Sequence, residues 1–170
     1  MDLRERAALL RESGEAFARA GDTARALLFH DAAIDLYLQA GDTDTAEALC
    51  ETVVTLAPNG VRARCTLAWL AVLLASPDLI VRRVAQYAEA AVAEGAADRA
   101  CRQLRCMAGE CDDVAVLEVL ADALLHLGDE PAATRVYGRI YSRAVPARIY
   151  ENQADRQRVV AARLTLEVTV

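Results

Sequence analysis

The first apolar positions of the chain follow a helical period. Leu3, Ala7, Leu10, Gly14 and Phe17 advance by steps of four and three residues, which places them on one face of an α-helix. Charged side chains lie between them, so the opposite face is polar. Because Ala and Gly lie within the apolar stripe, a neighbouring helix can approach closely. The pattern predicts an amphipathic helix that packs through one side.

Turn signals divide the rest of the chain into segments of about 13 to 18 residues, the length of ordinary helices. The predicted breaks are Gly21-Asp22, Gly41-Asp42, Pro58-Asn59-Gly60, Ser76-Pro77-Asp78, Gly95, Gly109, Gly128-Asp129 and Val145-Pro146. We therefore predict about eight helices, with a ninth candidate over 147–163. The segment 61–75 is apolar nearly all round and holds the only tryptophan, Trp69, so we expect it to be the most buried helix.

The last seven residues, 164–170, change to a period of two with β-branched residues, which predicts a short β-strand. Three interpretations remain open: a tail that pairs with the edge of another chain, the start of a missing β segment, or a terminus with accidental alternation. The chain is accordingly divided into a helical domain over 1–163 and an extended tail, or the start of a further segment, over 164–170.

A short motif recurs at the predicted turns. Residues 17–26 read FARAGDTARA and residues 37–46 read YLQAGDTDTA, so an aromatic residue, Ala-Gly-Asp-Thr and a later Ala return after 20 residues. A weaker copy covers 124–133. In each copy Gly can end a helix in the left-handed conformation, and the following Asp or Thr can cap the next helix. Such short turns predict antiparallel packing of successive helices.

These units resemble the tetratricopeptide repeat family. The resemblance covers about two thirds of the chain and is carried by three sets of residues. They are Gly14, Phe17, Gly21, Asp22, Ala26 and Ala33; Tyr37, Gly41, Asp42, Ala46 and Pro58; and Leu117, Leu120, Ala121, Leu124, Gly128, Asp129, Ala133 and Tyr137. The first two Gly-Asp turns lie closer together than the family's period of about 34 residues, so one helix is interpreted as shared between two units.

The resemblance implies an all-α, tetratricopeptide-like solenoid of antiparallel helical hairpins. It also implies a non-enzymatic scaffold or adaptor that holds a protein or peptide partner in a groove. We expect that groove to span the first four helices, with Leu10, Phe17 and Tyr37 as groove or core residues. Two alternatives remain open: a cytosolic secretion-type chaperone that shields an apolar client, and an all-α enzyme or small-ligand sensor with an internal pocket.

Composition narrows the classes of function. The chain has 36 Ala among 170 residues, which favours close-packed helices over sheet. All 19 basic residues are Arg, against 25 acidic residues, and the net charge of −6 makes nucleic acid an unexpected ligand. The longest apolar stretch, 67–75, is nine residues, too short to span a membrane, and the start lacks a signal-peptide core. We therefore expect a cytoplasmic protein. Together with the resemblance to tetratricopeptide repeats, this leads to the hypothesis of an interaction module that organises a bacterial protein assembly.

The sequence offers no catalytic, cofactor or metal signature. Its two histidines, His30 and His126, both lie inside predicted helices and are interpreted as core or boundary residues. The five cysteines lack the paired spacing of zinc sites and are interpreted as small buried side chains in a reducing compartment. No catalytic residue, cofactor or metal site is therefore assigned.

One charged pattern stands out on the last predicted helix. Arg135, Arg139 and Arg143 are spaced by four residues and so share one helix face. This face is either a solvated outer surface or a docking strip for an acidic partner segment. The acidic first third of another copy is one such segment, and it would give head-to-tail self-association into an oligomer.

Overall fold

The computed structural model describes residues 2–74 and 77–144, which form eight α-helices. Their bounds are α1 Leu3–Arg19, α2 Thr23–Gln39, α3 Thr43–Leu56, α4 Val61–Leu74, α5 Pro77–Ala93, α6 Ala97–Glu110, α7 Val114–His126 and α8 Glu130–Ala144. The candidate ninth helix over 147–163 and the predicted strand over 164–170 lie outside the described residues.

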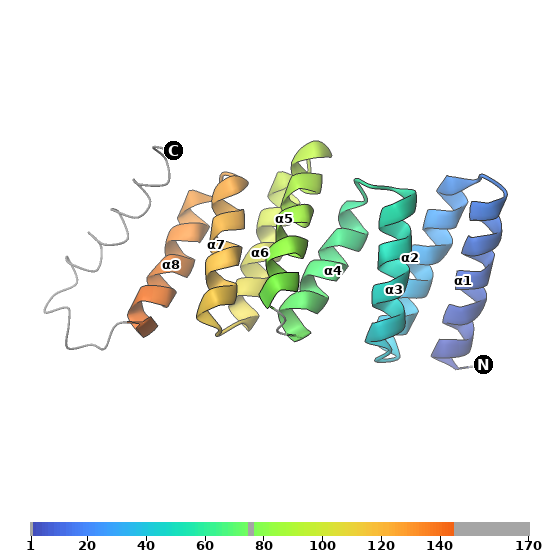
Figure 1. The fold of residues 1–170 in the computed structure, drawn as a ribbon, viewed down its shortest axis with the longest axis horizontal. Coiled ribbons are helices and arrows are strands. Elements are labelled where there is room, and N and C mark those ends of the chain that lie inside the picture. Colours follow the sequence, from blue (N-terminus) through green and yellow to red (C-terminus); the bar gives the residue numbers. More distant parts are fainter. Residues whose placement is uncertain (1, 75–76, 145–170) are drawn as a thin grey trace, which may run out of the picture.

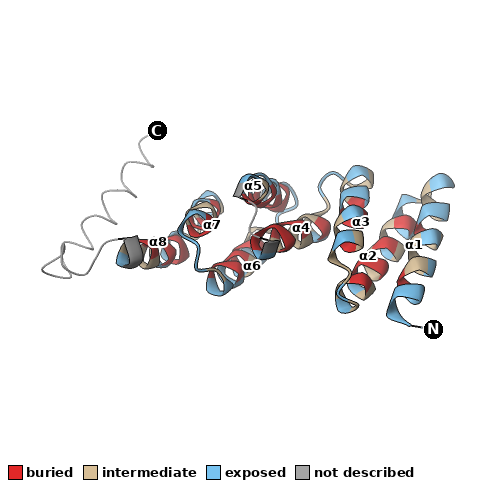
Figure 2. Cartoon of the chain, turned by 60° about the horizontal axis from the view of Figure 1, so that its bottom comes forward, coloured by how far each residue is buried: buried red, intermediate tan, exposed pale blue. Residues whose placement is uncertain are grey.

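The helices stand side by side in chain order, and each packs against the next (Figure 1). Alternate helices also meet: α5 contacts α7, and α4 contacts α6. Helices α5 and α7 therefore lie in one layer, and α4, α6 and α8 lie in the other (Figure 2). The prediction of an all-α, tetratricopeptide-like solenoid of antiparallel hairpins is confirmed.

Four turns share one backbone design. Gly21, Gly41, Gly95 and Gly128 all have positive φ, between 64° and 83°, the left-handed conformation that glycine adopts without strain. In each turn the glycine N–H donates to the carbonyl three residues earlier, and the next N–H donates to the carbonyl five residues earlier. This pair of bonds satisfies carbonyls that the end of a helix otherwise leaves without partners. Gly95 makes the same turn although no Asp follows it.

Aspartates cap the helices that follow. Asp22 accepts from Arg25 N at 3.1 Å, Asp42 from Thr45 N at 3.2 Å, and Asp129 from Ala132 N at 3.2 Å. Each bond satisfies one of the free N–H groups at the start of a helix. The Gly-Asp pairs identified in the sequence are therefore helix-stop and helix-start signals, as predicted.

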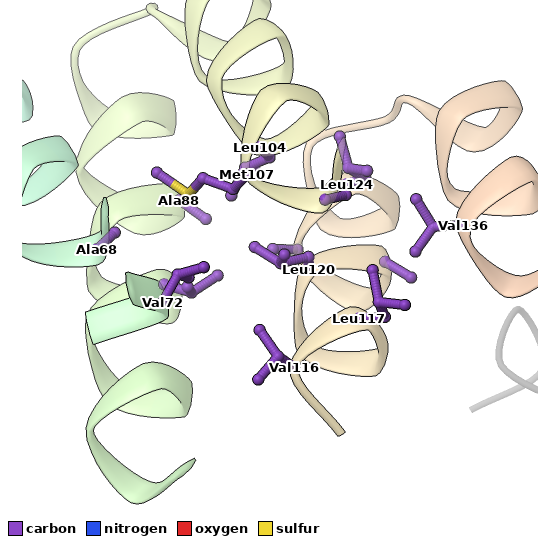
Figure 3. Packing of buried hydrophobic residues seen from close by; sticks show 14 of the residues in the cluster. Ala68, Val72, Ala88, Leu104, Met107, Val116, Leu117, Leu120, Leu124 and Val136 are labelled. Carbon is purple, nitrogen blue, oxygen red and sulfur yellow. The ribbon is translucent and has the colours of Figure 1, made fainter. Parts of the chain in front are cut away.

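The buried side chains form two clusters that meet at α4. The first joins α1 to α4 and includes Ile34, Tyr37 and Leu49; from α4 it takes Ala63 and Leu67. The second joins α4 to α8, as Figure 3 shows for a set of its hydrophobic side chains. From α4 it takes Ala68, Ala71 and Val72. Helix α4 therefore supplies one stretch of residues to each cluster.

Trp69 is less enclosed than its position on an apolar helix predicts. Its side chain is only partly buried, and it packs against the second cluster. Its indole Nε1 donates to Oε1 of Gln103 on α6 at 3.0 Å. Leu73, one turn further along α4, is 66% exposed. One edge of α4 therefore faces solvent, because the helix is covered by α3, α5 and α6 and by no further layer of the described chain.

Candidate functional site

An open apolar groove runs between α5 and α7, the first helices of two successive hairpins. It has a volume of about 280 Å³. Its lining residues are Val81, Val84, Ala85, Ala88, Glu89, Val119, Asp122, Ala123 and His126. Its most buried lining residues are Val84, Ala88 and Ala123, which form an apolar floor with contributions from both helices, whereas Val81 and Ala85 are exposed beside it.

Helix α5 can line this groove and still pack in the core because it carries two apolar stripes. Ile80, Val84, Tyr87 and Ala91 are each at most 1% exposed and belong to the second cluster. Val81, Ala85, Ala88 and Val92 form the second stripe, offset by one residue along the helix. Val81 and Val92 are 52% and 53% exposed, so much of this stripe faces solvent.

The edges of the groove carry two carboxylates and one imidazole. Glu89 lies on the α5 side, and Asp122 and His126 lie on the α7 side; all three are exposed. The hydroxyl of Tyr137, a residue of α8 that is 1% exposed, donates to Oδ1 of Asp122. A rigid, buried side chain therefore holds this carboxylate at the edge of the groove.

Two further hollows are more polar. One, of about 120 Å³ among α4, α5 and α6, contains Cys65, Tyr87 and Arg99. Burial raises the pKa of the Tyr87 hydroxyl well above its usual range, and a hydrogen bond with Cys65 adds to this shift. The other, of about 320 Å³, lies between α6 and the turn that joins α7 to α8, where Arg105 pairs with Asp129 at 3.6 Å. Neither hollow offers the apolar floor found between α5 and α7.

Two of the three residues expected in an N-terminal groove belong to the first cluster or pack against it. Tyr37 is 4% exposed and is a member of that cluster, and Leu10 packs against it while partly buried. Phe17 is partly buried and stacks on Phe29, with ring centroids 5.3 Å apart, while the Arg25 guanidinium lies 5.4 Å from its centroid. None of the three lines the groove between α5 and α7.

The arginines of α8 have different surroundings. Arg135 is exposed. Arg139 donates to the carbonyl oxygens of Ala108 at 2.5 Å and of Cys111 at 3.0 Å, at the carboxyl end of α6, and lies 3.6 Å from Asp112. The side chain of Arg143 lies outside the described part of the chain. Arg139 therefore joins α8 to α6, a contact that the spacing of four residues could not reveal.

The groove residues were not identified from the sequence, although a signal existed. Val81, Ala85 and Ala88, which line the groove, repeat at helical spacing beside the core stripe of the same helix. A helix that is apolar on two faces needs two partners, or one partner and a binding surface. His126, interpreted as a core or boundary residue, is exposed at the edge of the groove.

Metal-binding and membrane-spanning features are absent from the described residues. Within residues 2–74 and 77–144, no cluster of three or more His, Cys, Asp or Glu side chains is arranged to hold a metal ion. No helix in the same part of the chain combines the length and the apolar character needed to cross a bilayer.

Comparison with known proteins gives low-identity likenesses to solved structures. No protein-family model matches the sequence, and no curated protein matches it. A structure described as MamA MSR-1 aligns with a TM-score of 0.33 at 18% identity, over 81% of this chain and 95% of that one. A tetratricopeptide repeat protein from Parabacteroides merdae aligns with a TM-score of 0.31 at 18% identity, over 82% of this chain and 66% of that one.

A third solved structure, a thermophilic tetratricopeptide repeat protein from Thermus thermophilus, is similar at 15% identity. The alignment has a TM-score of 0.30 and covers 94% of this chain and 99% of that one. Because these identities and TM-scores are low, the description of the fold rests on the helices and glycine turns of this chain itself.

Proposed function

We propose that the chain is a non-enzymatic interaction scaffold whose α5/α7 groove binds a short segment of a partner protein. The observation that carries this proposal is an apolar floor left open to solvent between two helices that otherwise pack closely. Exposed aliphatic surface of this kind is typical of sites that bind another protein. The five free cysteines fit a reducing, cytoplasmic setting for this role.

The open form of the groove favours binding over catalysis. Val81, Glu89, Asp122 and His126 are all exposed, so water reaches the titratable side chains at its edge. Enzymes gain much of their rate from charges held in a site that excludes water. A surface groove with an apolar floor instead suits an aliphatic side chain that is projected by a peptide or a helix.

The test begins with peptide selection. The full chain is used as bait for a random-peptide phage library, and the selected peptides are synthesised with a fluorescent label. Binding is then measured by fluorescence anisotropy for the native chain, for Ala85→Trp, which fills the groove, and for Gln86→Trp, which places the same bulk on an exposed position of α5 outside the groove lining.

We expect Ala85→Trp to weaken binding at least tenfold, because the loss of a buried aliphatic anchor at an interface costs about 2 kcal/mol. Gln86→Trp should bind as the native chain does. Equal binding by all three chains, with circular dichroism spectra unchanged, would contradict a site in this groove. Failure to select any peptide would contradict the proposal as a whole.

A further inference from the structure

The α5/α7 groove combines an apolar floor with two carboxylates at its edges. Of its nine lining residues, all within the described part of the chain, two are carboxylates and none is Arg. The chain contains 19 basic residues, all of them Arg, so basic side chains are common elsewhere in the sequence. The groove therefore presents negative charge beside a surface that attracts aliphatic groups.

We infer that the groove selects a protein segment in which Lys or Arg neighbours a small aliphatic side chain. This inference rests on the proposed function and adds the chemistry of the partner. The aliphatic group would contact the apolar floor, and the cationic group would reach the carboxylates of Glu89 and Asp122.

The two carboxylates come from opposite walls. Glu89 follows the floor residue Ala88 on α5, while Asp122 precedes the floor residue Ala123 on α7. A cation attached to a segment in the groove therefore meets negative charge from both helices. Both carboxylates are exposed, so solvent weakens this attraction, and it contributes to the choice of partner more than to the strength of binding.

Asp122 is held in place for this role. The buried Tyr137 donates to its Oδ1 atom, so the carboxylate is oriented before any partner arrives. Orientation in advance reduces the entropy that binding would otherwise cost. Asp122→Asn keeps an oxygen that can accept from Tyr137 and removes the charge, so it tests the charge alone.

The same charges argue against a nucleic acid as the occupant. Phosphate groups would be repelled by Glu89 and Asp122, and none of the lining residues is an Arg that could hold them. The net charge of −6 for the whole chain acts in the same direction. A cationic, aliphatic protein segment is the occupant that these observations favour.

The experiment uses the phage-selected peptides described above with three further reagents. The first is the double variant Glu89→Gln/Asp122→Asn. The second is its matched control Glu12→Gln/Asp44→Asn, which removes the same charge at exposed positions on α1 and α3. The third is each selected peptide with Gln in place of its basic residues. Binding is measured by fluorescence anisotropy at low and at raised salt.

We expect the selected peptides to be enriched in Lys or Arg beside Ala, Val or Leu. The groove double variant should bind them about 5- to 10-fold more weakly, as two exposed ion pairs are lost. The control double variant should lose much less affinity. Peptides with Gln in place of their basic residues should bind weakly to every chain. Raised salt should reduce the difference in affinity between the native chain and the groove variant.

Other outcomes separate this inference from the proposed function. If Ala85→Trp blocks binding while Glu89→Gln/Asp122→Asn does not, the groove is the site but its charge selectivity is refuted. If Ala85→Trp has no effect, the proposed function itself fails. If a synthetic peptide of residues 145–170 binds the groove more tightly than any selected peptide, the occupant is a segment of this chain, and a separate cationic partner is refuted.

Discussion

The imidazole of His30 occupies the space that a side chain at position 14 would need. A Cβ atom added to Gly14 would lie 2.7 Å from both Cε1 and Nδ1 of His30, closer than such atoms approach in real structures. His30 is 0% exposed, so its ring is enclosed by the surrounding side chains. Helices α1 and α2 therefore pack closely because a glycine on one meets a ring on the other.

We expect Gly14→Ala to destabilise the chain by about 1–3 kcal/mol, the usual cost of adding a methyl group to a filled site. Alanine favours a helix by about 1 kcal/mol over glycine, so the clash must exceed that gain. In a His30→Ala background, Gly14→Ala should instead stabilise the chain, because alanine increases helix propensity and no longer meets the ring. Urea denaturation of the four chains of this double-mutant cycle measures both effects. Additive changes would contradict the contact.

The same histidine should make stability depend on pH. Burial lowers the pKa of His30 below its usual 6.5, although Glu15 and Asp31 oppose the shift, so the fold favours the neutral ring. Well above pH 6.5 the ring is neutral in both the folded and the unfolded chain. As pH falls below 6.5 the unfolded chain takes up the proton first, and the free energy of unfolding decreases.

The measurement compares unfolding midpoints in urea from about pH 8 to about pH 5.5, the range in which histidine titrates. The native chain should lose more stability over this range than His30→Leu does, whatever the absolute stability of that variant. His126→Gln, which replaces the other histidine at an exposed position, is measured in parallel as the matched control. If the unfolding midpoints of the native chain and of His30→Leu change with pH by the same amount, His30 is not the source of the pH dependence.

Arg83 provides a third prediction. Its side chain is 4% exposed, and its Nη2 atom lies 2.5 Å from Oε1 of Glu47 and 3.0 Å from Oε1 of Glu51, so it joins α5 to α3. Its Nε and Nη1 atoms are buried without a hydrogen-bond partner among the described residues. The guanidinium therefore depends on these two carboxylates to offset the loss of its hydration.

Removing both carboxylates should cost more than removing the arginine. We expect Glu47→Gln/Glu51→Gln to destabilise the chain by about 2 kcal/mol, because the buried charge loses its counterions. Arg83→Met should cost less than half as much, since it removes the charge and keeps an aliphatic chain of similar length. Urea denaturation measures the free energy of unfolding of both variants. A larger loss of stability for Arg83→Met than for Glu47→Gln/Glu51→Gln would refute this account.

The fourth prediction separates the arginines of α8. Arg139 donates to the two carbonyl oxygens at the end of α6, so Arg139→Glu should cost about 1–3 kcal/mol through the loss of hydrogen bonds from a charged donor. Arg135→Glu, at an exposed position, should change stability by less than about 0.5 kcal/mol. Thermal unfolding checks stability, and light scattering of both variants checks whether either arginine supports self-association.

Local chemistry explains how much of the fold the sequence predicts. A glycine followed by Asp carries both the end of one helix and the start of the next, so the turns at Gly21, Gly41 and Gly128 are predicted from adjacent residues. Gly95 is found only as a break, because Ala96 after it makes no side-chain cap. Gly21, Gly95 and Gly128 close the α1–α2, α5–α6 and α7–α8 hairpins, whereas Gly41 joins α2 to α3.

The groove could not be predicted in the same way, because its walls come from helices that are not consecutive. Val81 and Val119 are 38 residues apart in the sequence, and only the stacking of hairpins brings them to one surface. The role of Arg139 was missed for the same reason, since its acceptors lie 28 and 31 residues away. Periodicity identifies the face of a helix, but the identity of its neighbour depends on the assembled fold.

Helix α4, which contributes to both hydrophobic clusters, has a consequence for how the molecule opens. Loss of α1 to α3 would strip one side of α4 and leave its other side covered, and loss of α5 to α8 would do the reverse. Amide hydrogens of α4 should therefore exchange with deuterium only when both halves have opened, and so more slowly than those of the terminal helices. Helix α4 is therefore the structural element common to both halves, and it should be the last helix to unfold.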